Sequence, residues 1–208
     1  MSSEKTPASG LILILGGARS GKSTFAERLA ANSGRTVAFI ATATADDDEM
    51  RERIAHHRAS RPREWHTLEE PLDLAGALVQ AYKLADVVLL DCITLWLGNM
   101  LLQESAGQVE SDDKGKEATS SLFDERALKE IEALLAVIQS AEPHKTLIVV
   151  TNEVGLGIVP AYALGRVYRD TLGYVNQLLA HAADRVYLMV AGMAVDIKRL
   201  QIDTDLSV

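Results

Sequence analysis

The sequence lacks several features that would assign it to particular classes of protein. It contains one cysteine, Cys92, which excludes an internal disulfide and favours a reducing compartment. The polar N-terminal residues 1–10 are followed by an apolar run (11–15) that is too short for a signal-peptide core or a membrane span. The chain has 21 Lys and Arg but 29 Asp and Glu, which gives it a net charge of -8. We therefore expect a cytoplasmic protein that has no membrane span and does not bind nucleic acid.

The composition fits a single folded domain. Hydrophobic residues make up 48% of the chain and charged residues 24%, the proportions of a soluble globular protein. A chain of 208 residues is long enough to bury a full core in one domain, and the sequence shows no internal repeat. We expect one domain over residues 11–200, after a flexible N-terminal extension (1–10) and before a tail (201–208).

Short apolar segments alternate with longer helix-like segments. The apolar segments have the length of strands and are nearly continuous in apolarity, as in strands buried on both faces of a parallel sheet. They cover 11–15, 36–41, 87–91, 146–151 and 185–190. The helices expected between them cover 22–32, 46–59, 71–82, 94–103, 124–141 and 160–182. This alternation predicts an α/β fold with a mostly parallel central sheet flanked by helices.

One polar segment interrupts the alternation. Residues 103–125 are rich in small and charged side chains, which predicts a mobile loop. Such a loop can close over an active site, so a role as a lid stays open.

A phosphate-binding motif follows the first apolar segment and opens the first expected helix. The segment GGARSGKS (16–23) fits the pattern G-x-x-x-x-G-K-[ST], whose glycines let backbone N–H groups approach phosphates. Lys22 can reach the outer phosphates, and the Ser23 hydroxyl can bind Mg²⁺. The alternative, a glycine turn with a chance lysine, is disfavoured by the strand before it and the helix after it. The predicted nucleotide-binding residues of this motif are Gly16, Gly17, Ala18, Arg19, Ser20, Gly21, Lys22 and Ser23.

A carboxylate ends a second buried strand. Asp91 closes the apolar segment 87–91, and a carboxylate at such a strand end, beside the phosphate loop, can bind Mg²⁺ directly or through water. Together the two elements predict binding of a nucleoside triphosphate with Mg²⁺. The Asn-Lys-x-Asp element of many GTPases is absent, and its nearest counterpart, TNEVG (151–155), lacks the lysine. Asn152 and Glu153 in this segment either contact substrate or Mg²⁺, or form only a turn.

Two of the chain's five histidines, His56 and His57, are adjacent in the expected helix 46–59. His57 shares a face with apolar residues, whereas His56 follows Glu52 by four residues on a polar side. Glu52 could fix the ring tautomer of His56 and leave a neutral nitrogen as a nucleophile toward phosphorus. Helix-end histidines that bond to carbonyl groups are the alternative, and the residues alone leave both open. A metal site is disfavoured because adjacent helical side chains point about 100° apart.

Three arginines, Arg58, Arg61 and Arg63, follow the histidines. They either meet phosphates or balance the acidic residues of the expected helix, and the residues alone do not decide between these roles. Cys92 is interpreted as a small buried hydrophobic residue.

Four segments together resemble the bifunctional adenosylcobinamide kinase / adenosylcobinamide-phosphate guanylyltransferase family of cobalamin biosynthesis. They are GGARSGKS, IATATADDDEMRERIAHHRASRPREWHTLEEP, LLDCIT and VVTNEVGLGIVP, and the resemblance covers about residues 11–198. It implies a single-domain P-loop NTPase fold of the RecA-like type. It also implies two activities: ATP or GTP phosphorylates the aminopropanol hydroxyl of adenosylcobinamide, and GTP then transfers GMP to that phosphate. The products of the second step are adenosylcobinamide-GDP and pyrophosphate.

The resemblance assigns roles to individual residues. It implies that His56, the first histidine of the pair, forms a GMP–histidine intermediate, that Lys22 stabilises charge on the phosphates, and that Mg²⁺ binds at Ser23 and Asp91. Because His56 and the phosphate loop belong to different helices, we hypothesise that nucleotide binding moves the helix 46–59. Further nucleotide contacts are implied at Thr42, Ala43, Thr44, His57, Arg58, Ala59, Ser60, Glu69 and Asp91.

The resemblance also bears on partners and on competing functions. It implies a homo-oligomer, with a trimer as one arrangement, and Trp65 and Trp96 could stack on the corrin ring or pack in the core. Two other functions fit the phosphate loop. One is a single-activity small-molecule kinase with structural histidines, and the other is a nucleotide-dependent binding module without transfer chemistry.

Overall fold

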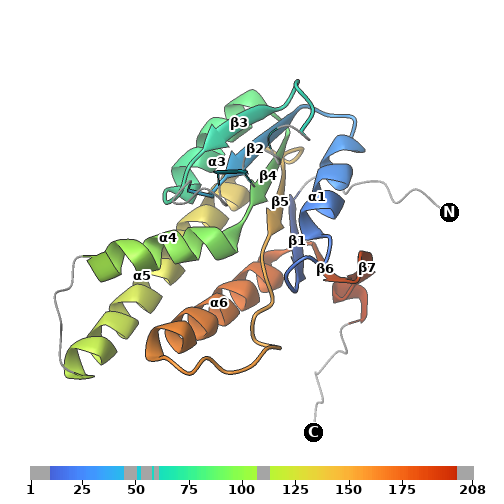
Figure 1. The fold of residues 1–208 in the computed structure, drawn as a ribbon. Coiled ribbons are helices and arrows are strands. Elements are labelled where there is room, and N and C mark those ends of the chain that lie inside the picture. Colours follow the sequence, from blue (N-terminus) through green and yellow to red (C-terminus); the bar gives the residue numbers. More distant parts are fainter. Residues whose placement is uncertain (1–9, 45–50, 53–57, 59–60, 107–112, 201–208) are drawn as a thin grey trace, which may run out of the picture.

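The computed structural model describes residues 10–44, 51–52, 58, 61–106 and 113–200. Within this part of the chain, seven strands form one sheet in the order β3-β2-β4-β5-β1-β6-β7 (Figure 1). Neighbouring strands are parallel except for β6 and β7. The strands are β1 (Gly10–Gly16), β2 (Val37–Ala41), β3 (His66–Glu69), β4 (Val87–Asp91), β5 (Thr146–Val150), β6 (Arg185–Val190) and β7 (Met193–Asp196). The predicted α/β fold with a mostly parallel sheet is confirmed.

The helices lie between the strands, as the sequence predicts. The first helix begins at Lys22, within the phosphate-binding motif. The helix that begins at Leu74 is capped by Asp73, whose side chain accepts a hydrogen bond from the Gly76 N–H at 2.8 Å. Of the expected helix 46–59, the described residues 51–52 and 58 are helical. Within the described residues, no helix combines the length and apolarity that crossing a membrane requires. The helices are α1 (Lys22–Ala31), α3 (Leu74–Leu84), α4 (Ile93–Ala106), α5 (Asp113–Ser140), α6 (Ala163–Ala182) and the short 3₁₀ helix η1 (Lys198–Leu200).

β1 lies inside the sheet, parallel to β5 on one side and to β6 on the other. Its side chains alternate between two cores, because Leu11 and Leu13 face one side of the sheet and Ile12 and Ile14 face the other. Each of these side chains is buried, and burial of one such side chain contributes roughly 1.5–3 kcal/mol. Burial on both faces therefore explains the continuous apolarity of residues 11–15.

The two faces of the sheet are covered unequally. α3, α4, α5 and α6 pack on one face, around a core that includes the fully buried Trp96 and Phe123 (Figure 1). α1 packs on the other face and makes its main contacts with β1, β4 and β5. β3 forms the edge of the sheet beyond β2, and its Thr67 and Glu69 are exposed.

The polar segment 103–125 is helical over most of its length, so the prediction of a mobile loop is wrong. Its first residues end α4 and its residues from 113 onward begin α5, whereas 107–112 lie outside the described residues. Phe123, Ala127 and Ile131 of α5 are buried, and their four-residue spacing places them on one helix face. Small and charged residues occur on exposed helix faces as well as in loops, which is why composition alone was misleading.

Two short edge strands were not predicted. β3 and β7 each have four residues and form the two edges of the sheet. An edge strand does not need the continuous apolarity that marks central strands, because one of its sides faces no other strand. The sheet also begins at Gly10, one residue before the predicted domain boundary. The remainder of the predicted extension and the tail 201–208 lie outside the described residues.

Candidate active site

The phosphate loop connects β1 to α1 in a tight turn. Gly21, the residue before α1, has a φ of 93°, a left-handed value that favours glycine. A Cβ on Gly16 would lie 2.5 Å from the carbonyl oxygen of Met189, so only glycine lets the loop pass this close to β6. The N–H of Ser20 donates to the Gly17 carbonyl at 3.3 Å. The geometry therefore requires glycine at position 16 and favours it at position 21.

Two polar side chains of the loop are buried. Lys22 is 8% exposed, and its Nζ donates to the Gly17 carbonyl at 2.7 Å. Ser20 is equally buried, and in the described part of the chain its Oγ has no hydrogen-bond partner. A buried hydroxyl without a partner is unfavourable unless a ligand satisfies it. The backbone N–H groups, the Ser20 hydroxyl and the Lys22 cation together fit the oxygen atoms of a phosphate chain.

The turn between β6 and β7 supports this loop. The N–H of Gly192 donates to the Ser20 carbonyl at 3.0 Å. A Cβ on Gly21 would approach the Cα of Gly192 to 3.3 Å. The loop is thus held by a segment that no sequence motif marks.

β5 lies between the phosphate loop and Asp91. The sequence predicts Asp91 beside the loop, whereas β4 is the second neighbour of β1 in the sheet, about 10 Å away at ordinary strand spacing. The segment after β5 occupies the interval, and the N–H of Glu153 donates to the Gly16 carbonyl at 3.1 Å. Asn152 and Glu153 therefore border the loop directly, and Asp91 lies one strand further away.

A buried residue of α6 holds the end of β5 in place. Asn176 donates to the Asn152 carbonyl at 3.0 Å and accepts a hydrogen bond from the Thr151 hydroxyl at 2.8 Å. The N–H of Asn152 donates to the Thr94 hydroxyl at 2.9 Å. These bonds fix the backbone beside the phosphate loop. Asn176 was not predicted, because a single polar residue on an amphipathic helix does not indicate its partner.

The carboxyl ends of β2 and β4 are joined at Thr42. The N–H of Thr42 donates to the Asp91 carbonyl at 3.3 Å, and its hydroxyl bonds to the backbone N–H and carbonyl of Cys92 at 2.8 Å. Asn99 of α4 donates to the Thr42 carbonyl at 2.8 Å. Thr42 is fully buried, whereas Thr44 is partly exposed and its hydroxyl donates to the Asn99 side-chain oxygen at 3.4 Å. The role of Asn99 was not predicted.

Cys92 does not have the properties of a nucleophile. Burial, together with the neighbouring Asp91 carboxylate, raises the pKa of its thiol to about 12. The thiol is therefore protonated at neutral pH, whereas a nucleophilic cysteine acts as the thiolate. Its packing against the apolar core under α1 agrees with the interpretation as a small hydrophobic residue.

Ser23 and Asp91 offer oxygen atoms of the kind that Mg²⁺ binds. Among the described residues, no group of three or more His, Cys, Asp or Glu side chains is arranged to hold a metal ion. Mg²⁺ usually binds through one or two protein carboxylates and takes its other ligands from phosphates and water. A hydroxyl at the start of α1 and a carboxylate at the end of β4 fit that requirement.

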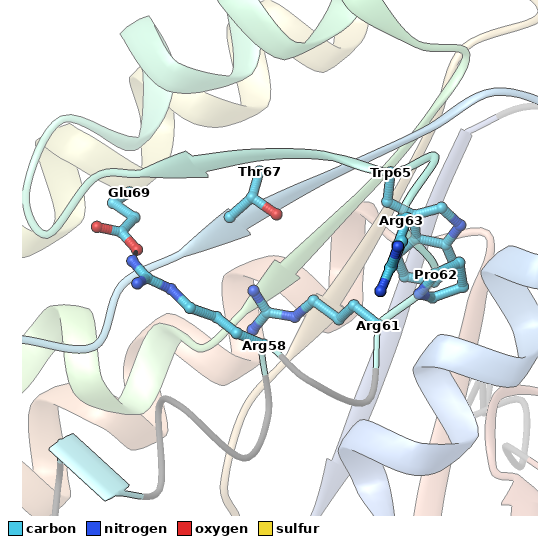
Figure 2. Close-up of a pocket in the computed structure, with 7 residues that line it drawn as sticks. All are labelled: Arg58, Arg61, Pro62, Arg63, Trp65, Thr67 and Glu69. Atoms are coloured by element: carbon cyan, nitrogen blue, oxygen red, sulfur yellow. Dashed lines mark ion pairs between the residues drawn. The ribbon is translucent and has the colours of Figure 1, made fainter.

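A cavity of about 560 Å³ lies over β2 and β3 on the α1 face of the sheet (Figure 2). We call it the arginine pocket. Glu69 at the end of β3 forms an ion pair with Arg58 across it. The guanidinium carbon of Arg61 lies 3.4 Å from the centroid of the Phe39 ring. The pocket is lined by Arg58, Arg61, Pro62, Arg63, Trp65, Thr67 and Glu69.

The two tryptophans have different environments. Trp96 is fully buried and donates its indole N–H to the Leu72 carbonyl at 2.8 Å, so it packs in the core. Trp65 is half-buried and lines the arginine pocket. Of the two residues, only Trp65 can contact a ligand.

The structure describes only part of the predicted site. The phosphate loop, Thr44 and Asp91 lie along the carboxyl ends of the strands, and Arg58 and Glu69 meet in the arginine pocket. The predicted nucleophile His56 lies outside the described residues, as do His57, Ala59 and Ser60. Arg58, which lines the arginine pocket, is the residue directly after the histidine pair in the sequence.

Comparisons with known proteins agree on one family. The family model described as cobinamide kinase / cobinamide phosphate guanyltransferase matches residues 12–197. The bifunctional adenosylcobalamin biosynthesis protein CobP of Pseudomonas aeruginosa is 45% identical over 186 residues, which cover 89% of this chain and 96% of the relative. The corresponding CobU protein of Escherichia coli K12 is 43% identical over 188 residues, which cover 90% of this chain and 99% of the relative.

A solved structure shows that the fold is shared more widely. A prototypical ATPase from the type III secretion system of pathogenic bacteria aligns with 95% of this chain and 61% of its own, with a TM-score of 0.53 and 10% identity. At this identity the likeness concerns the fold alone. Together with the parallel sheet and the phosphate loop, it confirms the predicted RecA-like P-loop architecture.

Proposed function

The chain belongs to the cobinamide kinase / cobinamide phosphate guanyltransferase family, and from this membership we propose which residues carry out its two reactions. The protein is a bifunctional enzyme of cobalamin biosynthesis that phosphorylates adenosylcobinamide and transfers the guanylyl group of GTP to adenosylcobinamide phosphate. One observation carries the assignment of roles. A phosphate loop with a buried, unpartnered Ser20 hydroxyl among the described residues lies inside the segment that matches the family.

In the first reaction, the phosphate loop binds the triphosphate of ATP or GTP. Lys22 exchanges its bond with the Gly17 carbonyl for bonds with the outer phosphates, and Arg19, which is exposed on the loop, adds a second cation. The aminopropanol hydroxyl of adenosylcobinamide attacks the γ-phosphorus, and the nucleoside diphosphate leaves. The loop acts mainly by positioning the phosphates and by stabilising their charge.

In this proposal, Ser23 and Asp91 would hold Mg²⁺. When bound, the ion neutralises charge on the phosphate oxygens. Ser23 lies at the start of α1, directly after the phosphate loop, and Asp91 ends β4, the second neighbour of the strand that leads into the loop.

In the second reaction, a neutral ring nitrogen of His56 attacks the α-phosphorus of GTP. The bond from this phosphorus to the bridging oxygen breaks, pyrophosphate leaves, and GMP remains on the histidine through a P–N bond. A phosphate oxygen of adenosylcobinamide phosphate then attacks the same phosphorus, which releases the histidine and forms adenosylcobinamide-GDP. Arg58 and Glu69, which pair in the arginine pocket, supply further nucleotide contacts.

Labelling with GTP tests this proposal. After incubation with α-labelled GTP and Mg²⁺ and denaturation, we expect a covalent label that is acid-labile and base-stable, as a P–N bond to histidine is. His56→Ala should lack this label and still release ADP from ATP when adenosylcobinamide is present, because the phosphate loop is intact. A wild-type protein that transfers GMP without ever carrying the label would reject the intermediate. Loss of the label in His57→Ala but not in His56→Ala would assign the nucleophile to His57.

We also propose that the enzyme is a cytoplasmic homo-oligomer, with a trimer as the arrangement to test. Leu156 and Ile158, in the segment between β5 and α6, are 85% and 96% exposed. Such exposed aliphatic side chains are suited to burial against a second copy of the protein. Light scattering of the purified protein gives the oligomeric mass. A monomer at micromolar concentration would contradict the proposal.

A further inference from the structure

The arginine pocket is positive in an otherwise acidic protein. Three arginines and one glutamate line it, whereas the whole chain has a net charge of -8. Glu69 pairs with Arg58, and within the described residues no ion pair is formed by Arg61 or Arg63. Figure 2 shows Arg58 and Arg61 both extending over the pocket. The pocket therefore has the charge expected of an anion site.

Arg61 is the arginine of this pocket that is fixed most firmly. It is half-buried, whereas Arg58 and Arg63 are exposed. Phe39, which is 1% exposed in the sheet, lies under its guanidinium. The Nε of Arg61 is buried and has no hydrogen-bond partner in the described part of the chain. A buried donor without a partner is unfavourable, so an incoming acceptor at this position would be stabilised.

Three charged groups interact electrostatically with Arg61. Asp91 at the end of β4 and Glu27 on α1 attract it, while Arg58 repels it. Burial lowers the pKa of Arg61 more than any of these charges changes it, yet a guanidinium remains protonated at neutral pH. Arg61 is therefore a permanent cation that is close both to the predicted Mg²⁺ ligand Asp91 and to the pocket.

We propose that Arg61 is a phosphate-binding residue of the guanylyl-transfer reaction and donates hydrogen bonds to a phosphate group in the arginine pocket. The planar guanidinium matches two phosphate oxygens at once, which a lysine ammonium does not. Stacking on Phe39 holds the guanidinium plane before the ligand arrives. The phosphate has two possible sources, the α-phosphate of GTP and the phosphate ester of the corrinoid acceptor. This inference rests on the proposed function, because it assumes that the histidine pair, which precedes Arg58 in the sequence, accepts GMP.

The test compares Arg61→Ala and Arg61→Lys with the full-length wild-type enzyme. Arg28→Ala is the matched control, because Arg28 is an exposed arginine of the neighbouring α1. Three rates are measured: ADP release with ATP and adenosylcobinamide, label incorporation from α-labelled GTP alone, and transfer of GMP from labelled enzyme to adenosylcobinamide phosphate. Thermal unfolding shows whether each variant is folded.

We expect both Arg61 variants to slow guanylyl transfer roughly 10- to 100-fold, the effect of losing a charged hydrogen bond, with ADP release changed less than about threefold. If labelling from GTP alone is slower, Arg61 binds the α-phosphate of GTP. If labelling is normal and the transfer to the acceptor is slower, Arg61 binds the phosphate of the corrinoid acceptor. If folded Arg61→Lys keeps wild-type rates in both half-reactions, the inference is wrong. An equal loss of all three rates also overturns it, because Arg61 would then be structural. Failure of the proposed function is distinguishable, since the wild-type enzyme itself would then take no label.

Discussion

The phosphate loop and the arginine pocket both suit anions, but their charged groups are held in different ways. In the loop, Lys22 and Ser20 are buried and the backbone is fixed by bonds from neighbouring strands. In the pocket, Arg58 is exposed and paired with Glu69, and only Arg61 is held by an aromatic ring. The loop is thus shaped before a ligand arrives, whereas a ligand of the pocket must compete with Glu69 for Arg58.

This difference fits the two kinds of ligand in the two reactions. The triphosphate chain is the same in ATP and GTP, so a rigid backbone cradle serves for both. In the proposed mechanism, guanylyl transfer presents a phosphate group in two successive compounds, first on the histidine and then on the corrinoid product. A pocket of side chains with exchangeable partners can accommodate both compounds more readily than a backbone cradle can. The following predictions test this contrast, from the largest effect to the smallest.

Replacement of the buried lysine should have the largest effect. Lys22→Ala should lower kcat/KM for adenosylcobinamide phosphorylation by about 100-fold or more, because one preorganised charge on the phosphates is lost. Initial rates of ADP release measure the change. Lys129→Ala, at an exposed position of α5, should have wild-type rates. If triphosphate affinity is the same in Lys22→Ala and in the wild type, the phosphate loop does not bind the nucleotide in this way.

The backbone of the loop should be intolerant of a side chain. Gly21→Ala forces a left-handed residue against Gly192 and should lower the free energy of unfolding by about 1–2 kcal/mol. Gly98→Ala is the matched control, since a Cβ there meets no atom within 4 Å and α4 should gain roughly 0.5–1 kcal/mol. Urea denaturation measures both. Equal stabilities for the two variants would contradict the view that the loop is rigid.

The pocket should tolerate substitution better than the loop does. Glu69→Gln breaks a pair whose side chains are 54% and 55% exposed, so stability should change by less than about 1 kcal/mol. If Glu69 contacts the nucleotide, the KM for GTP in the labelling reaction should rise roughly threefold to tenfold. Glu64→Gln, at an exposed position nearby, serves as the control. A decrease in this KM would mean that Glu69 only restrains Arg58.

A charged cluster away from the phosphate loop and the arginine pocket should affect stability only at acidic pH. A hydrogen bond from Lys145 lowers the pKa of Asp86, the residue before β4, and the Lys145 and His144 charges lower it further. The folded-state pKa lies below the unfolded value of about 3.9, so this carboxylate stabilises the fold above about pH 4. That contribution is lost as the pH falls through the folded-state pKa. Between about pH 4 and pH 2, the melting temperature of the wild type should therefore fall more than that of Asp86→Asn. Parallel curves would show that Asp86 contributes no pH-dependent stability, and labelling by GTP at neutral pH should be the same in both.

The sequence predicted those parts of the fold that depend on local backbone geometry or on burial from two sides. Gly21 is required by the left-handed backbone of the turn, and the central strands are apolar because both of their faces are covered. The helix 124–141 was predicted, whereas the earlier residues of α5 were assigned to a loop because small and charged residues dominate that part of the sequence. For the same reason, composition was a poor guide over 103–125.

The parts that were not predicted depend on contacts between distant segments. Arg61 meets Phe39 only because the segment before β3 crosses β2, and Ser20 meets Gly192 only because β6 lies next to β1. Likewise, no single motif predicts the strand order, in which β5 lies between β1 and β4. A pattern of residues can therefore propose a phosphate loop, but it does not show which other groups border it.

The position of β1 has a consequence for how the enzyme is made. β1 is synthesised early, yet both of its partners, β5 and β6, are synthesised late. While the chain leaves the ribosome, this apolar strand has two open edges, which makes the unfinished protein prone to aggregate. The bond from Gly192 to Ser20 forms later still. A growing chain therefore cannot complete its phosphate loop until the final hairpin has been added, so incomplete translation products should not retain ATP or GTP.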